Sequence, residues 1–258
     1  MVRAAAAGAP TRIMANIALN VKIRQKCRGS RPVLGVLGFQ LADGEIVALV
    51  GPSGCGKTTL LKIIGGLDTD FDGLISWRGD QRPRIGTVFQ EPRLLPWRTV
   101  RQNLALVLPP DARAGADDLL HRLNLWIFRD AYPAQLSLGM ARRVAIARAF
   151  AIEPEIVLLD EPFVSLDPEM AARCRDLLLD AWRRRPTAAL LVTHDMTEAA
   201  SLADRILLLS AGPMRILTDV TVPTSIRRNG VAAAAGFAQQ LAAMAGSPGA
   251  TSALPDRQ

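Results

Sequence analysis

The chain has 258 residues, enough for one large domain or two closely packed lobes with a substantial core. Hydrophobic residues make up 49% of it and charged residues 21%, a balance that is typical of a globular protein and excludes a disordered one. The net charge of +7 would suit nucleic acid or an anionic membrane surface as a partner. Because the arginines are scattered along the chain, this charge indicates at most a mild bias towards a membrane surface.

The three cysteines, Cys27, Cys55 and Cys174, are odd in number and lack the spacing of metal ligands. They indicate a reducing compartment without a disulfide framework. No uncharged apolar run reaches the ~18 residues that a membrane-spanning helix needs. The segment 1–12 lacks the bulky apolar core of a signal peptide. We therefore expect a cytoplasmic protein with a flexible leader over 1–12.

Strand signals dominate the first part of the chain. Two apolar-rich segments predict antiparallel strands joined by a polar turn over 25–32. A third, β-branched run reads as a buried parallel strand and leads into a predicted helix at 60–64. The expected strands lie at 17–23, 33–41, 45–50, 74–77 and 85–89.

Helical periodicity then replaces the strand signals. The expected helices lie at 100–106, 117–123 and 137–150. We interpret them as a helical subdomain, about 91–150, inserted into an α/β core. That core resumes with strands at 156–159, 188–192 and 206–209 and helices at 168–183 and 196–203. Strands that alternate with helices predict a largely parallel sheet.

This organisation divides the chain into three parts. The main domain is expected to span 13–230. The remainder, 231–258, is rich in alanine, glycine and serine, and we expect it to be partly disordered, with a weak helix over 232–245.

The stretch GPSGCGKTT fits the pattern of a phosphate-binding loop, Gly-x4-Gly-Lys-Ser/Thr, and lies between a predicted strand and a predicted helix, as this motif requires. Its glycines allow the backbone N–H groups to point inward, and the helix N-terminus adds partial positive charge. Lys57 is predicted to reach the β- and γ-phosphates of ATP, and the Thr58 hydroxyl to ligate Mg²⁺. The predicted nucleotide-binding residues here are Gly51, Pro52, Ser53, Gly54, Cys55, Gly56, Lys57, Thr58 and Thr59.

Two carboxylates, Asp160 and Glu161, follow the apolar run 156–159. The run places them at the C-terminal edge of the sheet, where α/β folds bind ligands. Asp160 is predicted to hold Mg²⁺, through water, and Glu161 to polarise the water that attacks the γ-phosphate. Such a pair on its own is equally compatible with solvated acids at a strand end, but the preceding phosphate loop favours the catalytic interpretation.

The segment Leu136-Ser137-Leu138-Gly139-Met140 opens a long predicted helix, and Ser137 is a good helix N-cap. Here the chain resembles the ATP-binding cassette family, whose signature reads Leu-Ser-Gly-Gly-Gln or Leu-Ser-Gly-Gly-Met. The resemblance implies that Ser137 and Gly139 face the γ-phosphate bound on a second copy, so that two chains sandwich ATP. Leu138 departs from the signature, because its side chain crowds a close phosphate contact and a positive φ would be costly there.

The resemblance extends to other residues in the same order. Gln90, after a predicted strand, resembles the glutamine that senses Mg²⁺ and the attacking water. Asp167 lies in a loop that would cross to the partner subunit. His194 resembles the histidine that contacts the γ-phosphate. The implied catalytic residues are Glu161, His194 and Gln90, and the implied metal ligands are Thr58, Gln90 and Asp160. The implied fold class is α/β, a P-loop NTPase core with a mostly parallel sheet, an antiparallel β subdomain and an inserted helical subdomain.

One expected element is missing. The family usually stacks adenine on an aromatic residue about two dozen positions before the phosphate loop, and the region 24–32 contains none. The Arg28 guanidinium is a candidate replacement, since its plane can stack on a base. A merely solvated Arg28 is the alternative.

The run 92–97, with the sequence PRLLPW, places two leucines and Trp97 in a connecting loop. This composition predicts a partner surface rather than a core, although a loop folded against its own lobe is the alternative. The run resembles the ATPase subunits of the nitrate, sulfonate and taurine importers. It implies a homodimer bound to an integral-membrane permease at the cytoplasmic face of the inner membrane, and indirectly to a periplasmic or lipid-anchored solute-binding protein. The transported solute would be a small anion such as an aliphatic sulfonate, taurine or nitrate.

Two alternative functions remain open. A cassette ATPase that acts on nucleic acid or ribosomes would explain the basic charge, but the chain has one cassette, no coiled-coil heptads and no zinc-type cysteine pairs, so no nucleic acid is expected. A small-molecule kinase would use the phosphate loop but would leave the segment 136–140 unexplained.

Overall fold

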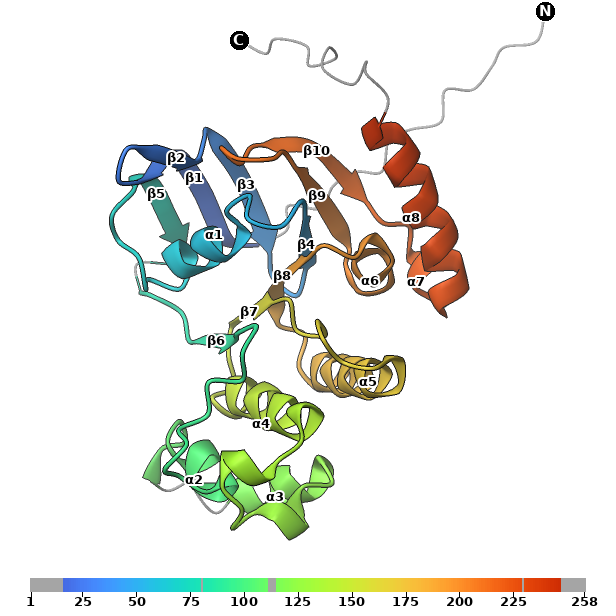
Figure 1. The fold of residues 1–258 in the computed structure, drawn as a ribbon. Helices are drawn as coiled ribbons and strands as arrows, with labels where there is room; N and C mark the ends of the chain where they lie inside the picture. The colour runs from blue at the N-terminus through green and yellow to red at the C-terminus, as the bar shows by residue number, and fades with distance from the viewer. Residues whose placement is uncertain (1–15, 80, 111–114, 229, 247–258) are drawn as a thin grey trace, which may run out of the picture.

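The computed structural model describes residues 16–79, 81–110, 115–228 and 230–246. These residues form a small antiparallel sheet, a larger mostly parallel sheet and a group of helices at one end of the molecule (Figure 1). The predicted α/β fold class, with its antiparallel and helical subdomains, is confirmed. The division into segments at 12 and 230 stays a prediction, and residues 1–12 lie outside the described ranges.

The antiparallel sheet is built around one long strand that pairs with its three neighbours. Its strands are β1 (Ile17–Arg28), β2 (Arg31–Leu34), β3 (Leu37–Ala42) and β5 (Asp72–Trp77). The predicted polar turn over 25–32 is wrong, because β1 continues to Arg28 and turns only at residues 29–30. The reason lies in Lys26, which is buried: its ammonium donates to an Asp68 carboxylate oxygen at 2.9 Å, so this polar residue is satisfied within a strand.

The larger sheet has the strand order β10-β9-β4-β8-β7-β6, and only β10 runs antiparallel to its neighbour. Its strands are β4 (Ile46–Val50), β6 (Ile85–Val88), β7 (Ile156–Asp160), β8 (Ala188–Thr193), β9 (Arg205–Leu209) and β10 (Ile216–Thr221). Every residue of β4, β7, β8 and β9 is buried. Burial on both faces explains why these strands read as unbroken apolar runs. The edge strand β10 alternates between half-buried and exposed residues and was not predicted.

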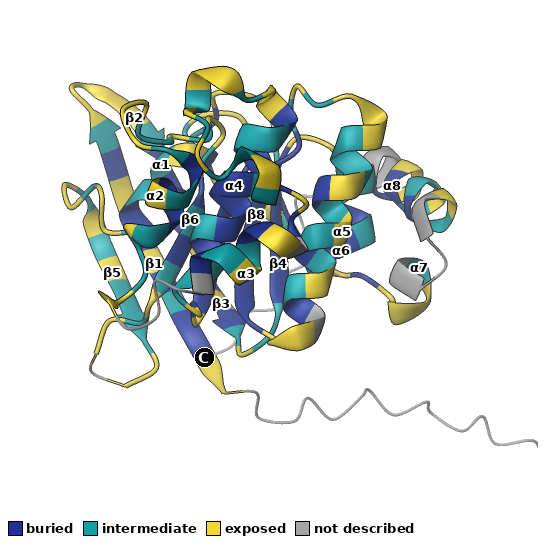
Figure 2. Cartoon of the chain, turned by 90° about the horizontal axis from the view of Figure 1, so that it is seen from below, coloured by how far each residue is buried: buried dark blue, intermediate teal, exposed yellow. Residues whose placement is uncertain are grey.

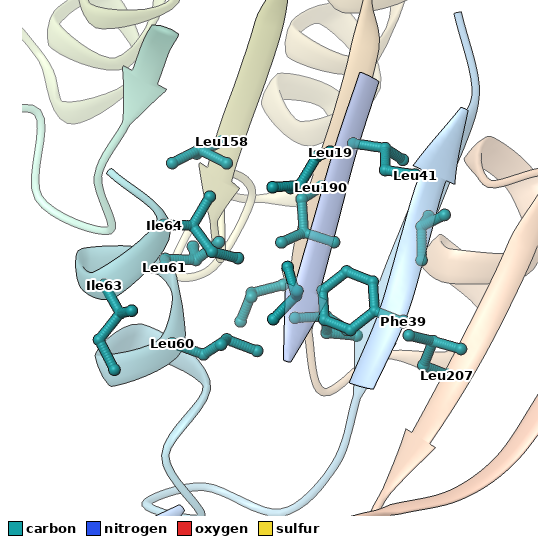
Figure 3. Close-up of a cluster of buried hydrophobic side chains, with 14 of the residues drawn as sticks. Leu19, Phe39, Leu41, Leu60, Leu61, Ile63, Ile64, Leu158, Leu190 and Leu207 are labelled. Atoms are coloured by element: carbon teal, nitrogen blue, oxygen red, sulfur yellow. The ribbon is translucent and has the colours of Figure 1, made fainter. Parts of the chain in front are cut away.

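Helices and the antiparallel sheet cover the two faces of this sheet. On one face, α1 (Lys57–Ile64) inserts Leu60, Leu61 and Ile64 against side chains such as Leu158 and Leu190 (Figure 3). The other face packs against the helices α5, α6 and α8. The bounds of these helices and their neighbour are α5 (Pro168–Arg184), α6 (Met196–Leu202), α7 (Thr224–Arg228) and α8 (Gly230–Gly246). Figure 2 shows the buried strands enclosed between exposed helical surfaces.

The helical subdomain has a third apolar cluster, centred on residues such as Leu104, Leu120 and Val144. Its elements are α2 (Val100–Ala105), α3 (Gly115–Arg122), the short 3-10 helices η2 (Trp126–Phe128) and η3 (Pro133–Gln135), and α4 (Leu138–Ala151). The helix α4 belongs to both lobes, since Val144 and Ala147 face this cluster while Ile146 and Ala149 pack under the main sheet.

The alanine-rich segment forms more than the weak helix expected at 232–245. The helix α8 spans Gly230–Gly246, and Ala234, Ala238 and Leu241 are buried. It packs against α6 and so extends the core on that face.

Gly86 in β6 provides a test of the packing between the sheet and α4. A Cβ atom at position 86 would lie 2.4 Å from the backbone oxygen of Ala149, which cannot move without shifting α4. Gly86→Ala should therefore lower the free energy of unfolding by about 1–3 kcal/mol in urea titrations. The control is Gly236→Ala in α8, where a Cβ meets nothing within 4 Å. This variant should be stabilised by roughly 0.5–1 kcal/mol, because alanine favours a helix over glycine. Equal stability of the two variants would show that the contact is not as tight as described.

Candidate active site

The phosphate loop lies between β4 and α1, as predicted, and its shape depends on glycine. Gly54 and Gly56 have φ values of +75° and +122°, a region that residues with a side chain rarely adopt. At Gly56 space is restricted as well, because a Cβ atom would lie 2.7 Å from Cδ2 of Leu34. The loop thus closes against the antiparallel sheet and ends directly at the N-terminus of α1.

Lys57 and Thr58 occupy the first turn of α1. The buried Lys57 side chain donates from Nζ to the carbonyl oxygens of Gly51 and Pro52, at 2.7 and 2.9 Å, so these two residues hold the ammonium beneath the loop. The Thr58 hydroxyl donates to Oδ1 of Asp160 at 3.1 Å. This hydrogen bond joins the helix after the loop to the end of β7.

Asp160 is the last residue of β7 and is only 4% exposed. Burial raises the pKa of its carboxyl group, whereas the Thr58 hydrogen bond and the Lys57 charge oppose that shift. Mg²⁺ is commonly held by one or two carboxylates together with phosphate oxygens and water. The side-chain oxygens of Thr58 and Asp160 lie 3.1 Å apart and are suitable ligands for such an ion.

Glu161 and His194 emerge from neighbouring strand ends. Glu161 follows β7 and has a φ of +46°, and its N–H donates to the carbonyl oxygen of Val192 in β8 at 2.9 Å. His194 follows β8, and its Nδ1 lies 3.5 Å from Oε2 of Glu161. The structure thus brings together two residues that the sequence separates by 33 positions (194 − 161) and that were both predicted to be catalytic.

A cleft of about 680 Å³ opens above the loop. Residues 53–59, Gln90 and Glu161 line it, as the predicted roles require, and so does Arg28. Sequence reasoning missed Arg31, Lys62, Gly212 and Pro213, which also line it. The turn that contains Gly212 and Pro213 follows β9, which neighbours β4 in the sheet. A predicted strand order would therefore have placed this turn at the same edge of the sheet as the phosphate loop.

The segment 136–140 lies apart from this cleft. Among the described residues that line the cleft, none comes from this segment, nor is Asp167 one of them. Ser137 caps α4 as predicted, and its Oγ accepts from the Met140 N–H at 3.2 Å. Ser137 and Leu138 are exposed, so this helix N-terminus faces outward.

The structure resolves two questions about this segment. Leu138 belongs to the helix and does not have a positive φ, so the expected backbone cost does not arise. Gly139 is buried, and a Cβ atom there would lie 2.5 Å from the Met170 side chain at the start of α5. Its lack of a side chain therefore leaves room for the Met170 side chain. Asp167 caps α5, accepting from the Met170 N–H at 2.9 Å.

The loop 92–97 only partly matches its prediction. Leu94 and Leu95 are half-buried, and Leu94 packs into the cluster of the helical subdomain, so the expectation of exposed leucines is wrong. The buried Asn103 fixes the loop by donating to the carbonyl oxygens of Leu95 and Arg98. Trp97 remains 69% exposed on this fixed loop.

Glu198, in the first turn of α6, was not predicted. Its Oε1 is buried and finds no hydrogen-bond partner among the described residues. Burial is the main cause that raises its pKa to about 8, and the Asp195 carboxylate adds to the shift. The Arg175 charge and a hydrogen bond with Thr193 oppose it. An acid in the first turn of a helix usually reads as solvated, so the sequence carries no signal of this environment.

A glycine-rich loop joins the parallel strand β4 to α1, and Thr58 after the loop donates to Asp160 at the end of β7, two strands away in the sheet. This arrangement defines a P-loop nucleoside triphosphatase. The comparisons then narrow the class. The sequence profile of the family described as ABC transporter matches residues 34–164. The chain belongs to this ABC transporter family and is an ATP-binding ATPase.

Relatives and solved structures agree with this assignment. The aliphatic sulfonates import ATP-binding protein SsuB 2 of Burkholderia lata is 44% identical over 82% of this chain and 80% of its own length. The corresponding SsuB protein of Bacillus subtilis is 42% identical over 83% of this chain and 88% of its own. A dimeric ATP-binding cassette in a post-hydrolysis state, bound to ADP and Pi, superposes with a TM-score of 0.69 at 29% identity, covering 80% of this chain and 99% of that one. No helix within the described ranges has the length and apolarity that crossing a membrane requires.

Glu198 gives the fold a dependence on pH. A carboxyl group with a pKa raised from 4.5 to about 8 keeps its proton in the folded state after the unfolded chain has lost it. The resulting stability is fully present below pH 4.5 and is lost as pH rises to about 8. Relative to the wild type, Glu198→Gln should become more stable with increasing pH, by at most about 1.4 kcal/mol per pH unit, in urea titrations at pH 5, 6.5 and 8.

The matched control is Glu169→Gln, at an exposed position in the first turn of α5. It should change the stability by less than about 0.5 kcal/mol at each pH. A Glu198→Gln variant whose stability parallels that of the wild type at all three pH values would contradict the buried environment.

Proposed function

We propose that this chain is the ATP-hydrolysing subunit of a bacterial importer and that its solute is a small anion, with an aliphatic sulfonate favoured over taurine or nitrate. The observation that carries the proposal is the division of the site: the phosphate loop and Glu161 line one cleft, with Asp160 bonded to Thr58 beside it, whereas the exposed N-terminus of α4 lies outside it. The named relatives are sulfonate import proteins, which supports the choice of solute.

A divided site is complete only when two copies meet. An N-terminus of a helix attracts anions, because its N–H groups and the helix dipole both favour negative charge. In the proposed homodimer, Ser137 and Gly139 of one copy approach the γ-phosphate held by Lys57 of the other. The dimeric cassette with ADP and Pi is similar enough in fold to support this arrangement.

The residues in and beside each cleft have separate tasks. Lys57 and the loop N–H groups bind the phosphates, and Thr59 extends this cradle at the start of α1. Thr58, Asp160 and Gln90 would hold Mg²⁺, which supplies positive charge at the phosphates. Glu161 polarises the attacking water, and His194, beside it at 3.5 Å, orients that water and the γ-phosphate. Asp167, which caps α5 beside Gly139, contacts the partner.

Arginine and proline side chains that line the cleft are the candidates for binding adenine. Arg28 and Arg31 line it from β1 and β2, and Pro213 lines it from the turn after β9. A guanidinium plane can stack on a base as an aromatic ring does. We therefore assign the adenine contact to Arg28.

The helical subdomain presents the surface for a permease. Trp97 and Ile127, which are 69% and 78% exposed, lie on it together with Leu106 and Tyr132. Exposed apolar side chains mark a protein interface where they form a contiguous patch, and we propose such a patch for this face of the subdomain. The subunit would thus sit at the cytoplasmic face of the inner membrane, bound to an integral-membrane permease and, through it, served by a solute-binding protein.

Glu161→Gln tests the ATPase and its dimer together. The variant keeps the phosphate contacts but loses the carboxylate that activates water, so hydrolysis should fall by at least about 100-fold. It should bind ATP and accumulate as a dimer, measured by light scattering after gel filtration with MgATP. The control Lys57→Ala should neither bind ATP nor dimerise. A Glu161→Gln variant that stays monomeric with ATP bound would contradict the proposed dimer, in which two copies enclose ATP.

The solute is tested by growth of a deletion strain. Loss of the gene should prevent growth on aliphatic sulfonates as the sole sulfur source and leave growth on sulfate intact, and taurine and nitrate should be tested in parallel.

A cassette ATPase that acts on nucleic acid or ribosomes would behave differently. DNA or RNA would stimulate its ATP hydrolysis at low salt, and this stimulation would be lost as salt rises. Stimulation of that kind together with normal growth on all three solutes would favour nucleic acid or ribosomes as the partner.

A further inference from the structure

Three arginines of α4 donate hydrogen bonds to main-chain carbonyl oxygens of other segments. Arg143 donates to Leu123 at 2.9 Å, and Arg148 donates to Pro92 and Arg93 at 3.0 and 2.9 Å. The third, Arg142, reaches the segment after β7. Since α4 also presents Ser137 at its exposed N-terminus, this helix contacts several parts of the site at once.

Arg142 is buried most deeply of the three and is 2% exposed. Its Nη1 donates to the carbonyl oxygen of Glu161 at 3.2 Å and its Nη2 to that of Val164 at 3.1 Å. Burial lowers the pKa of this guanidinium. Its Nε is buried and finds no hydrogen-bond partner among the described residues. A buried charge that carbonyl dipoles satisfy only in part is expensive for the fold, so its position calls for a functional reason.

The two carbonyl groups belong to a strained turn. Glu161 and Ser165 have φ values of +46° and +61°, although neither is glycine. Such conformations persist only where surrounding groups hold them, and they concentrate at functional sites. Arg142 donates hydrogen bonds to this turn at two points, the carbonyl oxygens of Glu161 and of Val164, the residue before Ser165. The direction of the Glu161 side chain therefore depends on the position of this guanidinium.

The same helix links the turn to the exposed N-terminus. Arg142 follows Ser137 by five residues (142 − 137), a separation of roughly 7.5 Å along a helix. A short helical segment moves as a rigid element, so a displacement at Ser137 is transmitted to Arg142.

We propose that Arg142 is a positioning residue that couples the nucleotide at the N-terminus of α4 to the catalytic carboxylate of its own chain. The inference rests on the proposed function, since that nucleotide belongs to the second copy. When α4 closes on the partner's γ-phosphate, Arg142 draws the Glu161 carbonyl with it and turns the carboxylate towards its water. Each copy then hydrolyses ATP only while the other is loaded.

Arg142→Lys tests this coupling, because lysine keeps the charge but cannot grip two carbonyl oxygens in a fixed geometry. We expect kcat for ATP to fall roughly 10- to 100-fold, as a small misplacement of a catalytic group does. The affinity for ATP should change less than about twofold, since Arg142 does not line the cleft. The Hill coefficient for ATP should stay as in the wild type, because closure around two nucleotides does not depend on Arg142. A fall in kcat at unchanged affinity is a change that a purely structural role would not produce.

The neighbouring Arg143→Lys is the matched control, since it also removes a guanidinium that donates to a carbonyl oxygen from α4. Its kcat should stay within about twofold of the wild type and its Hill coefficient should not change. Equal losses in the two variants, or a wild-type kcat in Arg142→Lys, would overturn the proposal. Arg142→Gln serves as a second variant, and failure of both Arg142 variants to fold would also overturn it by assigning the residue to stability.

A double variant separates this inference from the function on which it rests. Glu161→Gln/Arg142→Lys should still form the ATP-dependent dimer, because Arg142 acts on the carboxylate and not on closure. If Glu161→Gln alone does not dimerise, the sandwich itself fails. If Glu161→Gln dimerises while Arg142→Lys hydrolyses ATP with the wild-type kcat, only the coupling fails.

Discussion

Burial on both faces of the parallel strands is the constraint on which the rest of the structure depends. Since β4, β7, β8 and β9 are buried throughout, polar side chains can emerge only where these strands end. Asp160, Glu161 and His194 lie at or just beyond such ends, and Thr58 lies in the first turn of α1, after the loop that follows β4. The hydrogen bond from Thr58 to Asp160 shows the result, because it joins residues 102 positions apart across one edge of the sheet. The chemistry of the cleft thus follows from the way the core excludes water.

The helix α4 lies outside that constraint and serves both lobes. One side of it packs beneath the sheet and another contributes to the core of the helical subdomain, while its arginines hold loops from both. In the proposed coupling, the buried Arg142 transmits a movement of the helical subdomain to the turn after β7. The loop that presents Trp97 is held from the same helix by Arg148 and, within the subdomain, by Asn103.

The fold was largely predictable because its signals are local. Buried parallel strands leave unbroken apolar runs, so the parallel strands of the larger sheet were expected within a few residues of their bounds. The single strand expected at 33–41 is wrong, because the chain there forms two strands, β2 and β3. Most predicted site residues came from short motifs with a known spatial context, and the structure places Lys57, Thr58, Gln90 and Glu161 on one cleft. Their catalytic and metal-binding roles stay predictions.

What the sequence did not reveal depends on contacts between distant segments. Lys26 looked like part of a turn because its carboxylate partner lies 42 residues away. Leu94 looked exposed because the cluster that receives it is assembled from several helices. Glu198 and Arg142 are ordinary residue types at ordinary helical positions, and only burial makes them unusual.

The contact between Gly139 and Met170 affects how mutational scans of such cassettes are interpreted. A larger residue at position 139 first meets the Met170 side chain at the start of α5, so a lost activity there can report altered internal packing and is not by itself a sign of contact with nucleotide.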